Sequence, residues 1–127
     1  MNRAQWYAGL RKPGWKPPDW AVPVVWGVLY PMILLAGWLV WRQVGWGVEM
    51  AAWAAQMALN LAWPAVFMGL RSLNGAVVLA GLLWLSILAC VVLFLPVSAW
   101  AAGLMLPYLL WVGFAVALTE AIRRLNP

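Results

Sequence analysis

The chain contains no histidine, one cysteine (Cys90) and few charged residues, which make up 9% of its 127 positions. One cysteine cannot form a disulfide framework, and without histidine no Cys/His metal set can be completed within one chain. The commonest general base and the commonest haem ligand are missing for the same reason. A soluble domain of this length needs far more charge to cover its surface. We therefore expect a membrane protein that requires no metal or other cofactor.

Apolar and aromatic residues are abundant instead: 67% of the residues are hydrophobic and 12 are tryptophan. Tryptophan favours the headgroup zone of a bilayer, where an apolar ring and a polar N–H are both accommodated. The net charge of +5 could suggest nucleic acid, but the basic residues flank apolar stretches, as expected beside an anionic leaflet. The lipid bilayer is the expected partner, and nucleic-acid binding is not expected.

Three charge-free stretches set the architecture. Residues 20–41 and 50–70 each reach about 30 Å as a helix, enough for one crossing of the hydrocarbon core. Residues 72–119 are too long for one crossing, and we place a break at Pro96, with Ser98 capping the next helix. The sequence thus predicts an all-α membrane protein with four transmembrane helices, at about 20–41, 48–70, 73–94 and 98–120. These form one domain, 20–127, after a separate segment, 1–19.

Lysine and arginine are distributed unequally between the two sides of this arrangement. One side has Arg42 alone, and the other has seven basic residues: Arg3, Arg11, Lys12, Lys16, Arg71, Arg123 and Arg124. The positive-inside rule then predicts cytoplasmic N- and C-termini. The alanine-, glycine- and tryptophan-rich composition favours a bacterial cell membrane.

The segment 1–19 mixes tryptophans, prolines and cations before the first span. It could be an interfacial anchor with its tryptophan rings at headgroup depth. It could also be an ordered cap folded over one end of the bundle, stiffened by its prolines, with Trp15 pointing back towards the helices.

Helical spacing gathers the polar and aromatic residues of the spans into stripes, because residues three or four apart share a helix face. The stripes are Trp26 and Tyr30 on the first span, Gln56, Asn60, Trp63 and Phe67 on the second, and Tyr108, Trp111, Ala115 and Leu118 on the fourth. Aromatic walls with a few hydrogen-bonding groups suit a pocket for a flat, largely apolar ligand. Ordinary helix-packing seams would give the same spacing, and the pattern alone does not separate the two.

Alanines repeat at four-residue spacing on the second span, at Ala54, Ala58 and Ala62. Small residues at this spacing allow close approach of two membrane helices. We expect a homodimer that forms through this span.

Three runs resemble one known family. They are KPGWKPPDW followed by PVVWGVLY (residues 12–20 and 23–30), QMALNLAWPAVFMGLR (residues 56–71) and LPYLLWVGFAVAL (residues 106–118). In this order they are similar to the TspO/MBR family of translocator and tryptophan-rich sensory proteins. The resemblance covers nearly the whole chain.

The resemblance implies a porphyrin-binding protein with a sensory, regulatory or tetrapyrrole-handling role. Family members bind porphyrins such as protoporphyrin IX, as well as sterols, in a cavity capped by the loop before the second of their five helices. Light-dependent breakdown of porphyrin is associated with some bacterial members, and Trp26 and Trp111 match the tryptophans linked to it. The implied ligand-binding residues are Trp15, Trp26, Tyr30, Asn60, Trp63, Tyr108, Trp111, Ala115 and Leu118.

Two features depart from the family pattern. The sequence begins within the capping loop, so we expect a TspO-like bundle that lacks the first of the usual five helices and has one open pocket wall. Thr119 follows Leu118 where the family often has asparagine, and no tyrosine precedes Arg123, so the proposed cholesterol-recognition pattern is incomplete.

Two other functions fit the same residues. One is a small dimeric transporter of an amphipathic ligand, although the interiors of the predicted spans hold no carboxylate to couple transport to protons, since Glu49 and Glu120 sit at span ends. The other is a structural subunit of a membrane complex, whose aromatic stripes would serve as contacts. No acid–base pair or activated nucleophile appears, so an enzymatic function has little support apart from the photochemistry.

Overall fold

The computed structural model describes residues 3–18, 20–69 and 73–126. Within these ranges the chain is helical, with no strand. The elements in order are α1 (Arg3–Gly9), α2 (Ala21–Val44), α3 (Val48–Pro64), the π-helical turn η1 (Ala65–Gly69), α4 (Leu73–Phe94) and α5 (Ala99–Leu125). The predicted all-α fold with four long helices is confirmed.

Three of these helices, α2, α4 and α5, are long and apolar enough to cross a bilayer. Their outward faces carry exposed leucine and valine side chains such as Leu34, Val78 and Leu110, which suits contact with lipid. The second predicted span differs, because α3 is α-helical for only 17 residues and becomes π-helical after Pro64. Together α3 and η1 cover residues 48–69, about the length needed for a fourth crossing.

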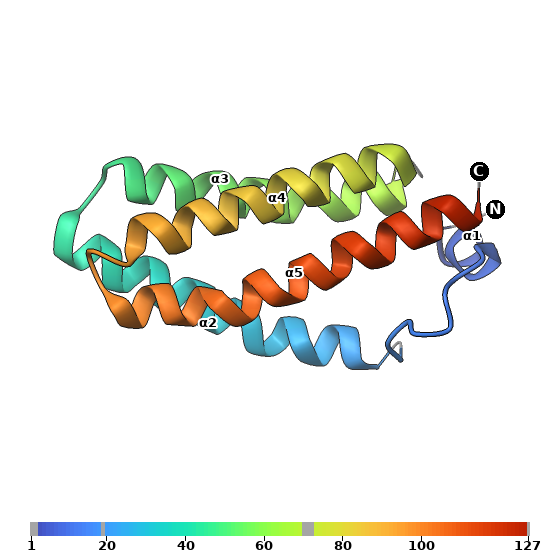
Figure 1. The fold of residues 1–127 in the computed structure, drawn as a ribbon, viewed down its shortest axis with the longest axis horizontal. Helices are drawn as coiled ribbons and strands as arrows, with labels where there is room; N and C mark the ends of the chain where they lie inside the picture. The colour runs from blue at the N-terminus through green and yellow to red at the C-terminus, as the bar shows by residue number, and fades with distance from the viewer. Residues whose placement is uncertain (1–2, 19, 70–72, 127) are drawn as a thin grey trace.

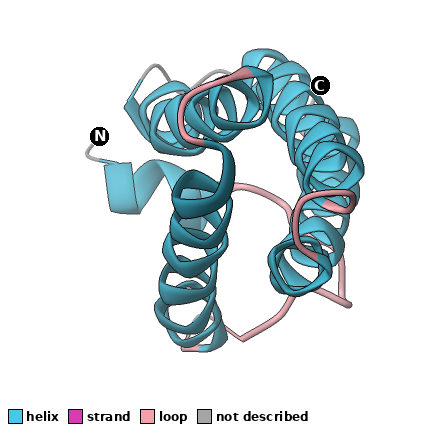
Figure 2. Cartoon of the chain, turned by 90° about the vertical axis from the view of Figure 1, so that its left-hand side faces the viewer, coloured by secondary structure: helices cyan, strands magenta, loops and turns pink. Residues whose placement is uncertain are grey.

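The four long helices run side by side, and both termini lie at the same end of the bundle (Figure 1). The opposite end carries the α2–α3 and α4–α5 connections, and Figure 2 looks along the helices from that end. α4 packs against α3 and α5, and α2 packs mainly against α5. The α2–α3 turn depends on Gly45, whose φ of 64° strains other residues. In the α4–α5 turn the Ser98 side chain accepts a hydrogen bond from the Ala101 N–H at 3.2 Å, as a helix cap should.

Basic residues gather at the end that holds the termini. The last turn of α5, with Arg123 and Arg124, lies there, and so does the segment between α1 and α2, whose sequence contains Arg11, Lys12 and Lys16. Arg42 lies in the last turn of α2, next to the α2–α3 connection, with its guanidinium 4.8 Å from the centre of the Trp38 ring. Arg71, which the sequence places with the first group, lies outside the described residues.

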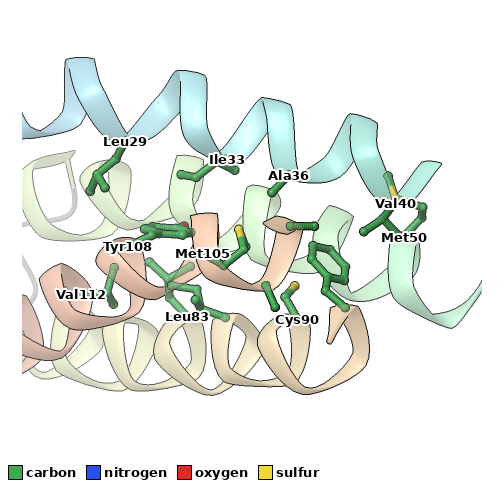
Figure 3. Close-up of a cluster of buried hydrophobic side chains, with 14 residues drawn as sticks. Leu29, Ile33, Ala36, Val40, Met50, Leu83, Cys90, Met105, Tyr108 and Val112 are labelled. Carbon is green, nitrogen blue, oxygen red and sulfur yellow. The ribbon is translucent and has the colours of Figure 1, made fainter. Parts of the chain in front are cut away.

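The half of the bundle next to the two short connections is closely packed. Its centre is a cluster of buried side chains from all four long helices, among them Ile33, Val40, Met50, Phe94 and Met105. Figure 3 shows this cluster between α2 on one side and α4 and α5 on the other. Close packing of this kind makes the half rigid. The other half of the bundle is therefore where space for a ligand remains.

The segment before α2 lies across that other half. The Arg11 N–H donates to the Asn126 side-chain oxygen at 3.0 Å, and the Asn126 amide donates back to the Arg11 carbonyl at 2.8 Å. The Trp6 ring meets Phe67 of η1 edge-on, with ring centres 5.6 Å apart. Residues 6 to 17 thus contact both η1 and the end of α5.

Candidate functional site

A cavity of about 560 Å³ lies in the half of the bundle covered by the N-terminal segment. All four long helices, η1 and the N-terminal segment contribute to its wall. The lining residues are Pro17, Val22, Pro23, Trp26, Tyr30, Asn60, Trp63, Pro64, Phe67, Ala80, Leu83, Trp111, Val112, Phe114, Ala115, Leu118, Thr119 and Ile122. The wall is almost entirely apolar, and its volume lies within the roughly 300–1,000 Å³ of ordinary small-molecule sites.

Aromatic rings on α3, η1 and α5 form two stacked pairs on the cavity wall. Trp63 and Phe67 stack with ring centres 4.9 Å apart and an angle of 9°, and the Trp63 N–H donates to the Ala76 carbonyl of α4 at 3.0 Å. Trp111 and Phe114 stack with ring centres 5.8 Å apart. Stacking and the hydrogen bond restrict the rotation of these rings, so the cavity presents flat, preformed surfaces.

The third aromatic contributor to the wall is Trp26 of α2. Its ring lies 5.5 Å from that of Tyr30 and meets Tyr108 edge-on at 6.1 Å. Tyr108 itself is fully buried and does not line the cavity, so its contact with Trp26 is made from behind the wall.

A chain of hydrogen bonds runs from the cavity wall into the packed half. The Tyr30 hydroxyl donates to the Asn60 side-chain oxygen at 2.5 Å, and the Asn60 amide donates to the Tyr108 hydroxyl at 2.8 Å. The Tyr108 hydroxyl donates in turn to the Gln56 side-chain oxygen at 2.7 Å. Polar groups within a bilayer need partners of this kind, and here they link α2, α3 and α5.

The structure gathers most of the residues predicted for the ligand site around this one cavity. Seven line it: Trp26, Tyr30, Asn60, Trp63, Trp111, Ala115 and Leu118. Tyr108 lies behind the wall, as described above. Trp15 is half exposed and reaches the site indirectly, with its ring edge-on to Phe114 at 5.5 Å between centres. The structure thus gives the location of these residues, and their role in ligand binding stays a prediction.

Two further aromatic residues line the wall, Phe67 and Phe114. Phe67 lies on the predicted stripe of Trp63, although it is not among the predicted ligand-binding residues. Phe114 was missed, although it follows Trp111 by one helical turn and the spacing could have identified it. Pro17 had no such signal, because its place in the wall depends on how the N-terminal segment crosses the bundle.

Comparison with known proteins agrees with this architecture. The family model described as the TspO/MBR family matches residues 1–125. The chain belongs to the TspO/MBR family. It is similar to Protein CrtK of Rhodobacter capsulatus, with 42% identity over 96% of this chain and 79% of that protein. It is also similar to the translocator protein of Homo sapiens, with 39% identity over 96% of this chain and 75% of that protein. The tryptophan-rich sensory protein of Cereibacter sphaeroides is 37% identical over 96% of this chain and 77% of its own length.

The three runs that carried the resemblance surround the cavity of this TspO/MBR protein. The first gives the N-terminal segment and the start of α2, the second gives α3 and η1, and the third gives the middle of α5. In the described part of the chain, no group of three or more His, Cys, Asp or Glu residues could hold a metal ion. The residues that line the cavity can offer apolar burial, aromatic stacking and a few hydrogen bonds.

Proposed function

We propose that this integral membrane protein binds a porphyrin of the protoporphyrin IX type, or a similar flat apolar molecule such as a sterol, in the cavity beneath the N-terminal segment. The main support is the cavity itself: about 560 Å³, with stacked aromatic pairs on its wall and a few hydrogen-bonding side chains, among them Tyr30, Asn60 and Thr119. An apolar site with few convergent polar groups suits a flat macrocycle that carries its polar groups on one edge.

The ligand faces would pack on the tryptophan rings, and its polar edge would lie near Tyr30 and Asn60. Apolar burial would supply most of the affinity. The gain is about 25 cal/mol for each Å² of apolar surface that leaves water, and it is smaller for a ligand that enters from the bilayer. A protein of this kind serves a sensory, regulatory or tetrapyrrole-handling role. The names of the relatives, translocator protein and tryptophan-rich sensory protein, are compatible with it.

Titration of the detergent-solubilised protein with protoporphyrin IX tests the proposal, with the porphyrin absorption band and tryptophan fluorescence as readouts. Saturable binding should weaken several-fold in Trp26→Phe and Trp111→Phe, since both rings line the cavity. Trp100→Phe is the matched control, because Trp100 is 82% exposed at the opposite end of the bundle. Equal weakening in all three variants, or no saturable binding to folded protein, would contradict the proposal.

Light-dependent porphyrin loss would be a secondary activity of the same site, with the bound porphyrin as chromophore and Trp111 or Trp26 as its oxidisable neighbour. Illumination of the complex should then bleach the porphyrin more slowly in Trp111→Phe at equal occupancy. An unchanged rate would remove Trp111 from the photochemistry.

We further propose a homodimer through α3. Ala54 and Ala58 are exposed on the outer face of α3 and Ala62 is partly exposed, whereas Gln56 and Asn60 on the other face are buried. A row of small outward residues permits close helix approach. Ala58→Trp should shift the protein to monomer in size-exclusion chromatography with light scattering, and Val78→Trp, on the exposed face of α4, should not.

The proposed location is a bacterial cell membrane with both termini in the cytoplasm. The basic residues at the end of the bundle that holds the termini favour that orientation. A cysteine introduced at Asn126 should resist a membrane-impermeant thiol reagent in intact cells, whereas one at Gly47 should react. The native Cys90 is fully buried and gives little background.

A further inference from the structure

The hydrogen-bond chain from Tyr30 to Gln56 ends in an unmatched donor. Gln56 is fully buried, and its side-chain N–H₂ group has no hydrogen-bond partner among the described residues. All three bonds of the chain donate in the same direction, from the cavity wall towards Gln56. The Tyr30 hydroxyl therefore donates to Asn60 and not to a ligand, while the Gln56 N–H₂ group at the other end of the hydrogen-bond chain remains unpaired among the described residues.

The same four side chains can be linked in the opposite direction. A hydroxyl can donate or accept, and a side-chain amide exchanges its oxygen and nitrogen by a half turn. Gln56 would then donate to Tyr108, Tyr108 to Asn60, and Asn60 to Tyr30. The Tyr30–Asn60 separation would lengthen from 2.5 Å to the roughly 2.9 Å of an N–H···O bond, a small movement at the edge of an open cavity.

The two directions differ only at their ends. In the reversed chain the unpaired group is the Gln56 carbonyl oxygen, and buried acceptors without a partner are tolerated better than buried donors. The Tyr30 proton is released from Asn60 and points towards the cavity that Tyr30 lines. In an apolar cavity that proton needs an acceptor, so the reversed chain is favoured when the ligand supplies one.

We propose that the cavity selects ligands that place a hydrogen-bond acceptor, a carboxylate or carbonyl oxygen, against Tyr30, and that Gln56 is the positioning residue that sets the direction of the chain. Gln56 does not line the cavity and acts only through Tyr108 and Asn60. The inference rests on the proposed function, because it names the ligand group that the same cavity recognises.

Two porphyrins of similar size test the inference. Protoporphyrin IX carries two carboxyl groups, and octaethylporphyrin carries only alkyl groups. The wild-type protein should bind protoporphyrin IX about fivefold to tenfold more tightly, the effect of one added hydrogen bond. Tyr30→Phe should reduce the ratio of the two dissociation constants to about one.

Gln56→Met tests whether the direction of the hydrogen bonds between Tyr30 and Gln56 sets the ligand preference. Methionine has a similar size and offers Tyr108 no strong acceptor, so Tyr108 should donate to Asn60. The hydrogen-bond chain should then stay in the reversed direction, with the Tyr30 hydroxyl always free to donate to the ligand. The preference for protoporphyrin IX should then rise at least twofold above the wild-type ratio, while binding of octaethylporphyrin is unchanged. Gln56→Leu is the second variant if the first does not fold. Ser86→Ala is the matched control, because the Ser86 hydroxyl donates to the Leu83 carbonyl on its own helix and Ser86 does not line the cavity, so its loss should not alter the ratio.

The outcomes separate the two proposals. If neither porphyrin binds the folded wild-type protein saturably, the proposed function and this inference are both wrong. If both porphyrins bind but the ratio is near one in the wild type, or does not rise when Gln56 is replaced, only the inference is wrong. A fall in both affinities by the same factor would show that Gln56 is purely structural, which also overturns it.

Discussion

Replacing Gly37 by alanine should destabilise the contact between α2 and α3. Gly37 is buried on α2, and the Trp53 ring of α3 lies directly over it. An alanine Cβ at this position would be 2.7 Å from Cε2 and 2.8 Å from Nε1 of that ring, closer than atoms can approach. The ring must therefore move, and with it the bond from the Trp53 N–H to the Ile33 carbonyl, now 3.0 Å long.

Three effects set the size of the change. Forcing a methyl group into a packed interface costs about 1–3 kcal/mol. Loss of the Trp53–Ile33 hydrogen bond adds about 1 kcal/mol. Alanine in place of a mid-helix glycine returns about 1 kcal/mol. The net expectation is that the free energy of unfolding falls by about 1–3 kcal/mol, with the packing cost setting the size of the change.

Unfolding in mixed detergent micelles, followed by circular dichroism, measures this change. Gly27→Ala and Gly103→Ala are the matched controls, because nothing lies within 4 Å of an added Cβ at either position, and both should be neutral or stabilising. Adding Trp53→Phe to Gly37→Ala should remove much of the packing cost, because phenylalanine lacks the indole Nε1 and Cζ2 atoms that lie over Gly37. The reasoning is refuted if Gly37→Ala is as stable as Gly27→Ala, or if the two substitutions at Gly37 and Trp53 are simply additive.

Three further substitutions test other contacts. Asn60→Leu removes the link between the Tyr30 and Tyr108 hydroxyls and should lower the free energy of unfolding by about 1–2 kcal/mol, measured in the same assay; an unchanged value would mean that the hydroxyls find other partners. Asn126→Ala removes both bonds to Arg11 and should speed tryptic cleavage after Arg11 with little change in the unfolding midpoint; unaltered cleavage would mean that other contacts hold the segment. Ser98→Ala removes the acceptor of the Ala101 N–H and should cost about 1 kcal/mol, whereas Ser98→Asp should keep the cap and the stability.

Charge-free length was enough to predict the four helices, but the helix ends depend on side-chain chemistry. α2 continues past the predicted residue 41 to Val44, because the Arg42 stem can lie along the helix while its charge rests over Trp38. α5 continues past residue 120 to Leu125, because Glu120 pairs with Arg123 and Arg124 one turn further on. A rule based on the absence of charge ends both helices too early, since it treats a paired charge as a break.

Periodicity identified which side chains share a helix face, but not whether that face borders a cavity or packs against a neighbouring helix. Trp26, Asn60 and Trp111 point into one cavity as the stripes suggest, whereas Tyr108, on the same stripe as Trp111, packs behind the wall. Spacing along one helix cannot distinguish these cases, because the result depends on how far the neighbouring helices stand away. The unpaired amide of Gln56 is likewise visible only once three helices are in place.

The distance between the helices in the cavity half follows in part from Pro64. Proline has no N–H for the carbonyl four residues earlier, which is that of Asn60, and its ring crowds that carbonyl. The helix changes from α to π immediately after Pro64, and π turns of this kind often occur at functional sites. The wider turn contains Phe67, which stacks on Trp63 and receives Trp6 from the N-terminal segment. One backbone irregularity therefore positions an aromatic wall and the contact for the segment that covers it, which explains why the open half of the bundle lies beside η1 and the closely packed half does not.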